Sequence, residues 1–95
     1  MKKIRLISLN EAKKLAMDKN YIVVDLRGRE DYEKGHIENA ICIESATLDN
    51  IKSFNRKDLI WILYCYRGSF SFQLAGEMAK EGYIVMAVVG GYKSI

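Results

Sequence analysis

Three apolar runs constrain the fold of this chain more than any other feature. They are YIVVDL (residues 21–26), DLIWILYC (58–65) and YIVMAVVGG (83–91), and each is apolar almost throughout. Such runs are typical of strands that are buried on both faces of a parallel sheet. They are too short to span a membrane as a helix, which takes about 20 apolar residues. The sequence therefore predicts a parallel sheet that is covered by helices.

Helical patterns lie between these runs. Residues 8–11 have the form of a capping box, and an apolar stripe continues from there to about Lys19. A second helix is predicted over 71–81, where Gly82 is placed to end it. Its apolar residues are Phe72, Leu74, Ala75, Met78 and Ala79.

Weaker patterns complete the predicted fold. They indicate an edge strand at 3–7, a helical turn at 29–35, a strand at 40–44 and a short helix at 47–54. Strands that alternate with helices in this way predict an α/β domain around a mainly parallel central sheet of about five strands, flanked by helices.

Size and charge limit the possible functions. A chain of 95 residues buries only about 60–65% of its unfolded surface, so we expect one domain over residues 1–95. The net charge of +3 comes from mixed charges of both signs, which argues against a nucleic-acid partner. No apolar leader pattern follows the basic start, so we expect a cytoplasmic protein with no membrane partner. Cys42 and Cys65 are not in metal-binding spacing, so no metal site is expected.

The segment after Cys65 predicts a reactive thiol. Ligands of open α/β sheets bind beyond the carboxyl ends of the strands, and Cys65 ends such a run. Gly68 can adopt backbone angles that other residues avoid, so successive N–H groups of the loop can converge on the sulfur. The start of the next helix and Arg67 add positive charge. We therefore expect a lowered pKa at Cys65, whereas the alternative is a buried, unreactive thiol beside a solvated arginine.

Three segments of the chain resemble rhodanese-type sulfurtransferases. CYRGSFS (65–71) is similar to the family's active-site loop, and VVGGYKSI (88–95) resembles its ending of two glycines and an aromatic residue, here Gly90, Gly91 and Tyr92. VVDLRGREDYEKGHIENAICI (23–43) is similar to a long family segment, and it matches at Asp25, Arg27, Asp31, Tyr32, Gly35, His36, Ile37 and Ala40. The segments occur in the family's order and cover nearly the whole chain.

The resemblance implies a fold and an activity. A rhodanese-like domain takes a sulfane sulfur from a donor such as thiosulfate, holds it as a persulfide on its cysteine, here Cys65, and passes it to a thiol or cyanide. An acceptor protein is a further possible partner, and neither an organic cofactor nor a metal is implied. Arg67 is expected to orient the donor, and Tyr66 and Phe70 to form an apolar rim. The expected substrate-binding residues are Tyr66, Arg67, Gly68, Ser69, Phe70 and Ser71.

Two other functions remain as alternatives. A rhodanese-like binding or sensor module of low activity would use the same loop to hold a partner. Cysteine phosphatases and arsenate reductases carry an arginine at the sixth position after the cysteine, where it grips a tetrahedral anion in two places. Ser71 stands at that position here, which disfavours phosphoryl chemistry.

Other polar residues are expected to be structural. Arg27 is predicted to bridge to a carboxylate such as Asp31 or Glu30, and Asp25 is placed in the same structural group. By resemblance, His36 belongs to a turn and is not a base for Cys65. Cys42 and Trp61 are expected in the core, with a role for Cys42 as a resolving thiol as the alternative.

The chain departs from the family pattern at three positions. Asn39 stands where glycine is usual, and asparagine is the next best residue at positive φ. Cys42 stands where asparagine is frequent, and Ile95 stands where an aromatic residue is common. Because the sequence stops there, we expect a C-terminus that is minimal or truncated.

Overall fold

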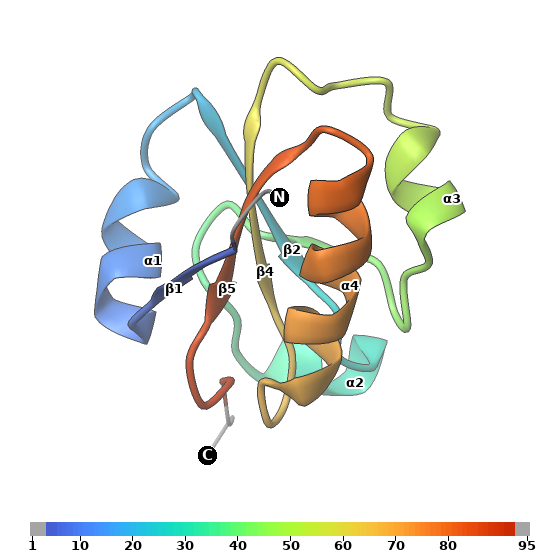
Figure 1. Cartoon of the computed structure of the whole chain (residues 1–95). Coiled ribbons are helices and arrows are strands. Elements are labelled where there is room, and N and C mark those ends of the chain that lie inside the picture. Colours follow the sequence, from blue (N-terminus) through green and yellow to red (C-terminus); the bar gives the residue numbers. More distant parts are fainter. Residues whose placement is uncertain (1–3, 93–95) are drawn as a thin grey trace.

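The computed structural model describes residues 4–92, which form an α/β fold with one five-stranded sheet (Figure 1). The strands are β1 (Arg5–Ile7), β2 (Tyr21–Asp25), β3 (Ile41–Cys42), β4 (Ile60–Tyr64) and β5 (Ile84–Val88). The helices are α1 (Leu9–Leu15), α2 (Arg29–Lys34), α3 (Leu48–Lys52) and α4 (Ser69–Lys80). The predicted α/β class and five-stranded sheet are confirmed.

All neighbouring strands are parallel, in the order β1-β5-β4-β2-β3. The central strand β4 pairs with β2 on one side and with β5 on the other. Because the strands share one direction, the segments that follow β2, β4 and β5 all leave the sheet at the same edge, the one formed by the carboxyl ends of the strands. This edge is where an open α/β sheet binds ligands.

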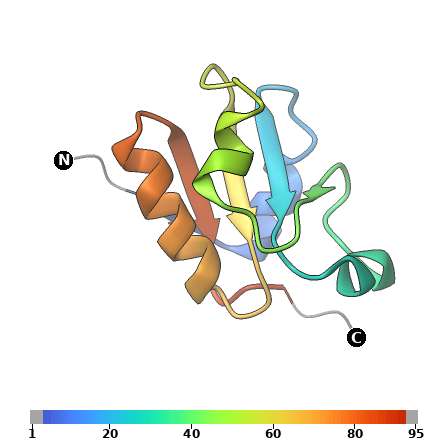
Figure 2. The ribbon, with the colours of Figure 1, turned by 90° about the vertical axis from the view of Figure 1, so that its right-hand side faces the viewer.

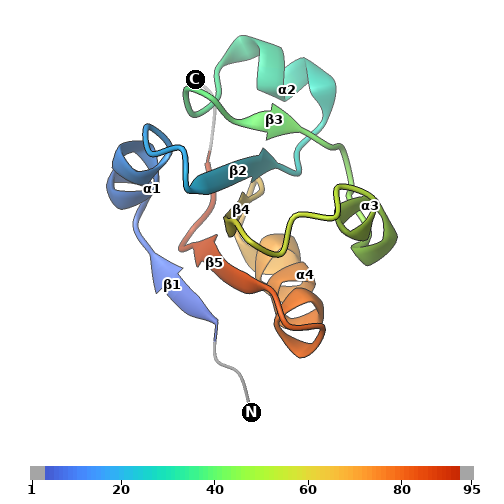
Figure 3. The same ribbon diagram turned by 90° about the horizontal axis from the view of Figure 1, so that it is seen from above.

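Helices cover both faces of the sheet, with α3 and α4 on one face and α1 on the other (Figures 2 and 3). Alternate residues of a strand point to opposite faces. Leu63 packs with α4, whereas Ile62 packs with α1, and both are fully buried. This double burial explains the uninterrupted apolar runs. Trp61 is fully buried as predicted, and its indole N–H donates to the carbonyl oxygen of Arg56 at 2.9 Å.

Helix α4 begins two residues earlier than predicted, at Ser69. Its buried stripe consists of Ser71, Leu74, Ala75, Met78 and Ala79. Phe72, which is among the apolar residues of this predicted helix, lies outside the buried stripe, because the spacing of i, i+3, i+4, i+7 and i+8 starts at Ser71. Phe72 is therefore turned outward and is 50% exposed.

Gly82 ends α4 as predicted. Its φ is +94°, and its N–H donates to the carbonyl oxygen of Ala79 at 3.1 Å. The N–H of Tyr83 donates to the carbonyl oxygen of Met78 at 3.1 Å. These two bonds form a Schellman motif, which favours glycine because its central residue is left-handed.

The shorter elements end where the backbone turns. The third strand covers two residues of the predicted 40–44, because the chain bends at Ser45, whose φ is +50°. Asn39 has a φ of +74°, which confirms the reason given for an asparagine there, and its amide donates to the carbonyl oxygen of Ala16 at 3.2 Å. Of the predicted edge strand 3–7, Lys3 lies outside the described residues. Within residues 4–92, no helix combines the length and apolar character that crossing a membrane would require.

Candidate functional site

Cys65 comes directly after β4, and the loop that follows encloses its sulfur. The residue is only 6% exposed. The backbone N–H groups of Gly68 and Ser71 donate to Sγ at 3.1 Å and 3.4 Å. The Cys65 thiol donates to the Ser71 hydroxyl oxygen at 3.6 Å, and that hydroxyl donates to the carbonyl oxygen of Gly68 at 2.9 Å. When the sulfur is ionised, the hydroxyl can rotate and donate to it. The converging N–H groups expected from the sequence are therefore present.

Gly68 is required by both its conformation and its surroundings. Its φ of +97° is left-handed, which disfavours residues that carry a Cβ atom. A Cβ atom there would also lie 3.2 Å from the backbone nitrogen of Gly90. Gly68 caps α4, so the N-terminus of a twelve-residue helix begins beside the sulfur. The positive end of its dipole favours a negative charge at this place.

The hydrogen bonds lower the pKa of Cys65. Burial of the sulfur by itself raises the pKa of the thiol. The Ser71 hydroxyl and the backbone N–H groups of Ser71, Gly68 and Arg67 outweigh this effect, and the pKa falls below that of an ordinary cysteine thiol. The predicted direction of the shift is confirmed, and the physical reason is hydrogen bonding to the thiolate.

A pocket of about 300 Å³ opens at the sulfur. It is lined by Leu26, Arg27, Cys65, Tyr66, Arg67, Ser69 and Phe70. Tyr66 and Phe70 are 44% and 40% exposed, as an apolar rim requires. Arg67 is exposed and makes no ion pair with another described residue. The six predicted loop residues therefore take two positions. Gly68 and Ser71 contact the sulfur. The other four line the pocket: Tyr66, Arg67, Ser69 and Phe70.

The segment after β5 packs against the loop from outside. Gly91 has a φ of +75°, and a Cβ atom there would overlap the carbonyl oxygens of Tyr66 and Cys65. The N–H of Tyr92 donates to the carbonyl oxygen of Cys65 at 2.8 Å. The sequence identified these residues only through a family resemblance, and the structure gives the physical reason for them. Ile95, the third departure from the family pattern, lies outside the described residues.

Arg27 and Asp25 form a buried ion pair beside the site. Arg27 Nη2 and Nε donate to the Asp25 carboxylate at 2.8 Å and 3.0 Å, and both side chains are almost fully buried. The guanidinium also donates to the carbonyl oxygens of Gly35 at 2.6 Å and Tyr92 at 3.4 Å, and it lies over the Tyr92 ring. The pair therefore joins β2, the end of α2 and the segment after β5, which agrees with a structural role.

Asp25 is the carboxylate of the buried pair, and Asp31, one of the two carboxylates named in the expectation, also acts on Arg27. Burial lowers the pKa of Arg27, but its hydrogen bond to Asp25 and the charges of Asp25 and Asp31 outweigh this and raise it. Asp31 is thus close enough to act through its charge. Glu30 instead lies 3.8 Å from Lys34 on the exposed side of α2. Asp25 can be the buried partner although it is only two residues from Arg27, because the chain turns sharply after β2. In that turn the backbone N–H of Arg27 also donates to the Asp25 carboxylate, at 2.8 Å.

His36 lies in the turn after α2, as the resemblance implied. The ring is exposed, stacks on Tyr32 with centroids 3.7 Å apart, and has Nδ1 2.6 Å from the carbonyl oxygen of Tyr32. It is not among the residues that line the Cys65 pocket. Across residues 4–92, no group of three or more histidine, cysteine, aspartate or glutamate side chains could hold a metal ion.

Cys42 is half-buried on the outer strand β3, so the expectation of a core position is only partly met. Cys42 on β3 and Tyr64 on β4 both pair with Asp25, which lies on β2 between them. Their backbones are therefore two strand spacings, or about 10 Å, apart. Cys42 shares the face of Asp25, whereas Cys65 packs on the opposite face with α4. Burial raises the pKa of the Cys42 thiol, which donates to the carbonyl oxygen of Arg27 at 3.7 Å. Neither its position nor its pKa suits a resolving thiol.

Comparisons with known proteins agree with this geometry. A family model described as "Rhodanese-like domain" matches residues 8–95. A similar protein is "Thiosulfate sulfurtransferase GlpE" of Coxiella burnetii, which is 29% identical over 89 residues, or 93% of this chain and 83% of that protein.

Solved structures show the same fold. A protein of Staphylococcus saprophyticus superposes with a TM-score of 0.78 at 22% identity, over 93% of this chain and 89% of that one. A rhodanese-related protein of Thermoplasma volcanium gives a TM-score of 0.77 at 24% identity, over 92% and 85% of the two chains.

Proposed function

The chain belongs to the family of rhodanese-like domains, and on that premise we propose that it is a sulfurtransferase that carries a sulfane sulfur as a persulfide on Cys65. The observation that carries the proposal is the enclosed sulfur, which accepts N–H groups from Gly68 and Ser71 and has a lowered pKa. A thiolate is the nucleophilic form of cysteine, and this loop stabilises it.

The first half-reaction loads the sulfur. The Cys65 thiolate attacks the sulfane sulfur of a donor such as thiosulfate and forms a new S–S bond. The S–S bond of the donor breaks, and sulfite leaves with its electron pair. Arg67, exposed at the pocket, supplies a positive charge for the anionic donor. The resulting persulfide is an anion, so the loop N–H groups that stabilise the thiolate also suit the loaded state.

The second half-reaction unloads it. A thiolate or cyanide attacks the outer sulfur of the persulfide, and the bond between that sulfur and Cys65 Sγ breaks. The electron pair returns to Sγ as the thiolate, so atoms and electrons balance without an external oxidant. The two half-reactions need no organic cofactor. A reducing compartment such as the cytoplasm suits this chemistry, because Cys65 must remain a free thiol.

Ser71 supports sulfur transfer over phosphoryl transfer. It stands at the sixth position after Cys65, is fully buried, and is bonded both to the sulfur and to Gly68. An arginine at that position would provide the clamp for a tetrahedral oxyanion. Here the position instead closes the loop around one sulfur atom.

Mass spectrometry of the intact protein tests the proposal. After incubation with thiosulfate, we expect the protein to gain one sulfur atom and to lose it again on addition of cyanide. Cys65→Ser should gain none, whereas Cys42→Ser should gain sulfur as the unsubstituted protein does. A folded protein that acquires no sulfur from thiosulfate or from other sulfane donors would contradict the proposal.

The exposed side chains of Tyr66 and Phe70 favour one alternative, a binding or sensor module of low activity. Such a module has no need of an activated sulfur, so its thiol would titrate near the unperturbed value of about 8.5. A thiol titration distinguishes the two functions, since the sulfurtransferase requires a clearly lower pKa at Cys65.

A further inference from the structure

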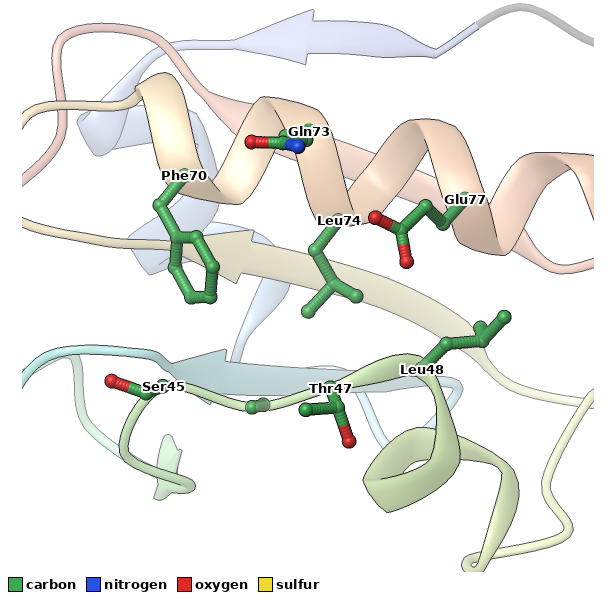
Figure 4. Close-up of a pocket in the computed structure, with 8 residues that line it drawn as sticks. Ser45, Thr47, Leu48, Phe70, Gln73, Leu74 and Glu77 are labelled. Atoms are coloured by element: carbon green, nitrogen blue, oxygen red, sulfur yellow. The ribbon is translucent and has the colours of Figure 1, made fainter.

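A second pocket, of about 330 Å³, lies between α4 and the segment that leads into α3 (Figure 4). On α4 it is lined by Phe70, Gln73, Leu74 and Glu77, and on the other side by residues 45–48. Phe70, Leu74 and Glu77 follow the spacing i, i+4 and i+7, so they share one face of the helix. In Figure 4 the side chains of Phe70 and Leu74 project towards the opposite wall, and the carboxylate of Glu77 is turned along the helix towards Leu74. We refer to this pocket as the α4 trough.

The α4 trough adjoins the Cys65 pocket, and the two are connected along both walls of the trough. Phe70 lines both pockets, so its ring stands at the point where they meet. On the opposite wall, Leu26 belongs to the Cys65 pocket and Ser45 to the trough. The N–H of Ser45 donates to the carbonyl oxygen of Leu26 at 3.1 Å. A molecule that reaches the sulfur can therefore extend past Phe70 into the trough.

The trough is apolar in its middle and acidic at its far end. Ala46 and Leu74 are buried in it, and Leu48 is half-buried. Neither Gln73 nor Glu77 has a bonded side-chain partner among the described residues. Lys52, on the neighbouring helix α3, lies 3.6 Å from Glu81, so its charge is already paired. The carboxylate of Glu77 is therefore available to a ligand.

We propose that the α4 trough binds the body of the sulfur acceptor, a small thiol with an apolar chain and a cationic group at its far end. The inference rests on the proposed function, since the thiol accepts the outer sulfur of the Cys65 persulfide. Its thiolate forms the new S–S bond, and the electron pair of the broken bond returns to Cys65. The cation, an ammonium or guanidinium group, lies against Glu77.

The helix sets the length of this acceptor. Glu77 follows Phe70 by seven residues, which is about 10 Å along the axis of α4. The thiol and the cation should therefore be separated by about 10 Å or slightly more. The volume of the trough lies at the lower end of the range for small-molecule sites, about 300–1,000 Å³.

Matched thiols test the inference through the rate of sulfur release. The probes are octane-length thiols that end in an ammonium, a hydroxyl or a carboxylate group, together with cysteamine, which carries the same cation on a chain too short to reach Glu77. With the thiosulfate-loaded protein, we expect kcat/KM for the long ammonium thiol to exceed that of the hydroxyl thiol by about threefold to fivefold, as a partly exposed charge pair allows. The carboxylate thiol should be the slowest of the three.

Substitutions of Glu77 assign the preference to the trough. Glu77→Gln should abolish the advantage of the long ammonium thiol and leave the rate with cysteamine unchanged. Glu77→Lys should reverse the preference in favour of the carboxylate thiol. The matched control is Glu38→Gln, which removes the same charge from an exposed residue outside both pockets and should retain the preference.

A binding measurement separates this inference from the proposed function. The S-methylated long ammonium thiol cannot accept sulfur, yet it should shift the amide NMR signals of Leu48 and Leu74 in the unloaded protein, and Glu77→Gln should weaken its binding. If the protein does not load but this binding occurs, sulfur transfer is wrong and the cation site stands. If the long thiols react equally, or if Glu77→Gln changes neither rate nor binding, the inference is overturned.

Discussion

The backbone N–H of Tyr92 donates a hydrogen bond of 2.8 Å to the carbonyl oxygen of Cys65, so the segment after β5 holds the Cys65 loop. Gly91 makes this contact possible, because any side chain there would overlap the carbonyl oxygens of Tyr66 and Cys65. The loop is thus fixed from two sides, by the cap of α4 inside and by this segment outside.

Gly91→Ala should destabilise the protein by about 3 kcal/mol or more, since it adds a steric overlap to the cost of a left-handed φ. The displaced loop should also raise the pKa of Cys65. Urea unfolding and a thiol titration measure the two effects.

Gly90→Ala is the matched control for that substitution. Gly90 has a similar φ of +76°, but a Cβ atom there would meet no other atom within 4 Å. The cost should be about 1 kcal/mol, with an unchanged thiol pKa. Equal losses in the two variants would mean that the approach to the loop carbonyls is unimportant.

The rate of persulfide loading should depend on pH through the Cys65 thiol. The reacting species is the thiolate, so the rate should reach a plateau above the lowered pKa and decrease as the pH falls through it. Ser71→Ala removes the hydroxyl that favours the thiolate and should move the plateau to higher pH. The pH profile of alkylation by iodoacetamide gives the same pKa independently.

Ser69→Ala serves as the control for Ser71→Ala. Ser69 lines the pocket, but its hydroxyl makes no hydrogen bond to the sulfur among the described contacts. Its pH profile should match that of the unsubstituted protein. A Ser71→Ala profile without a shift would show that the backbone N–H groups alone lower the pKa.

Asp25→Asn should destabilise the fold by about 3 kcal/mol or more, because it leaves the buried guanidinium of Arg27 without its bonded carboxylate. Urea unfolding at neutral pH measures the change. The chain contains a matched pair at the surface, Arg56 and Asp58, which are also two residues apart and form the same kind of ion pair at 2.9 Å. Asp58→Asn should leave the free energy of unfolding unchanged within error, and similar losses from the two substitutions would contradict the argument from burial.

Under the proposed function, Arg67→Ala should raise KM for thiosulfate by about threefold to tenfold, because it removes an exposed positive charge from the pocket that would take the anionic donor. Steady-state kinetics with cyanide as acceptor measure the effect, which should diminish at high salt. Arg56→Ala removes the same charge from the segment before β4, at the amino-terminal ends of the strands, and should leave KM unchanged. An unchanged KM in Arg67→Ala would assign donor binding to the backbone alone.

Local patterns were sufficient to predict the sheet and the thiol environment. The run 58–65 specifies a strand buried on both faces, and Gly68 and Gly82 stand where the backbone has to be left-handed. The lowered pKa of Cys65 could be predicted because the sulfur, Gly68 and Ser71 lie within a few residues of one another.

Features that depend on distant contacts could not be derived from spacing. The overlap that requires glycine at position 91 arises between segments that meet only in the folded sheet. The outward position of Phe72 follows from the residue at which α4 begins, which a periodicity of this length does not fix. Glu77 was not singled out in the sequence, because its place opposite α3 depends on how the two helices pack.

The contact between the segment after β5 and the Cys65 loop makes thiol reactivity a measure of complete folding. While that segment is not yet docked, the loop lacks its outer support, and the cysteine should behave as an ordinary thiol. A nascent chain or a partly unfolded intermediate would then carry a less acidic thiol at Cys65. The chemistry becomes available when the last strand has joined the sheet, so a reagent selective for acidic thiols would count only the fully folded molecules.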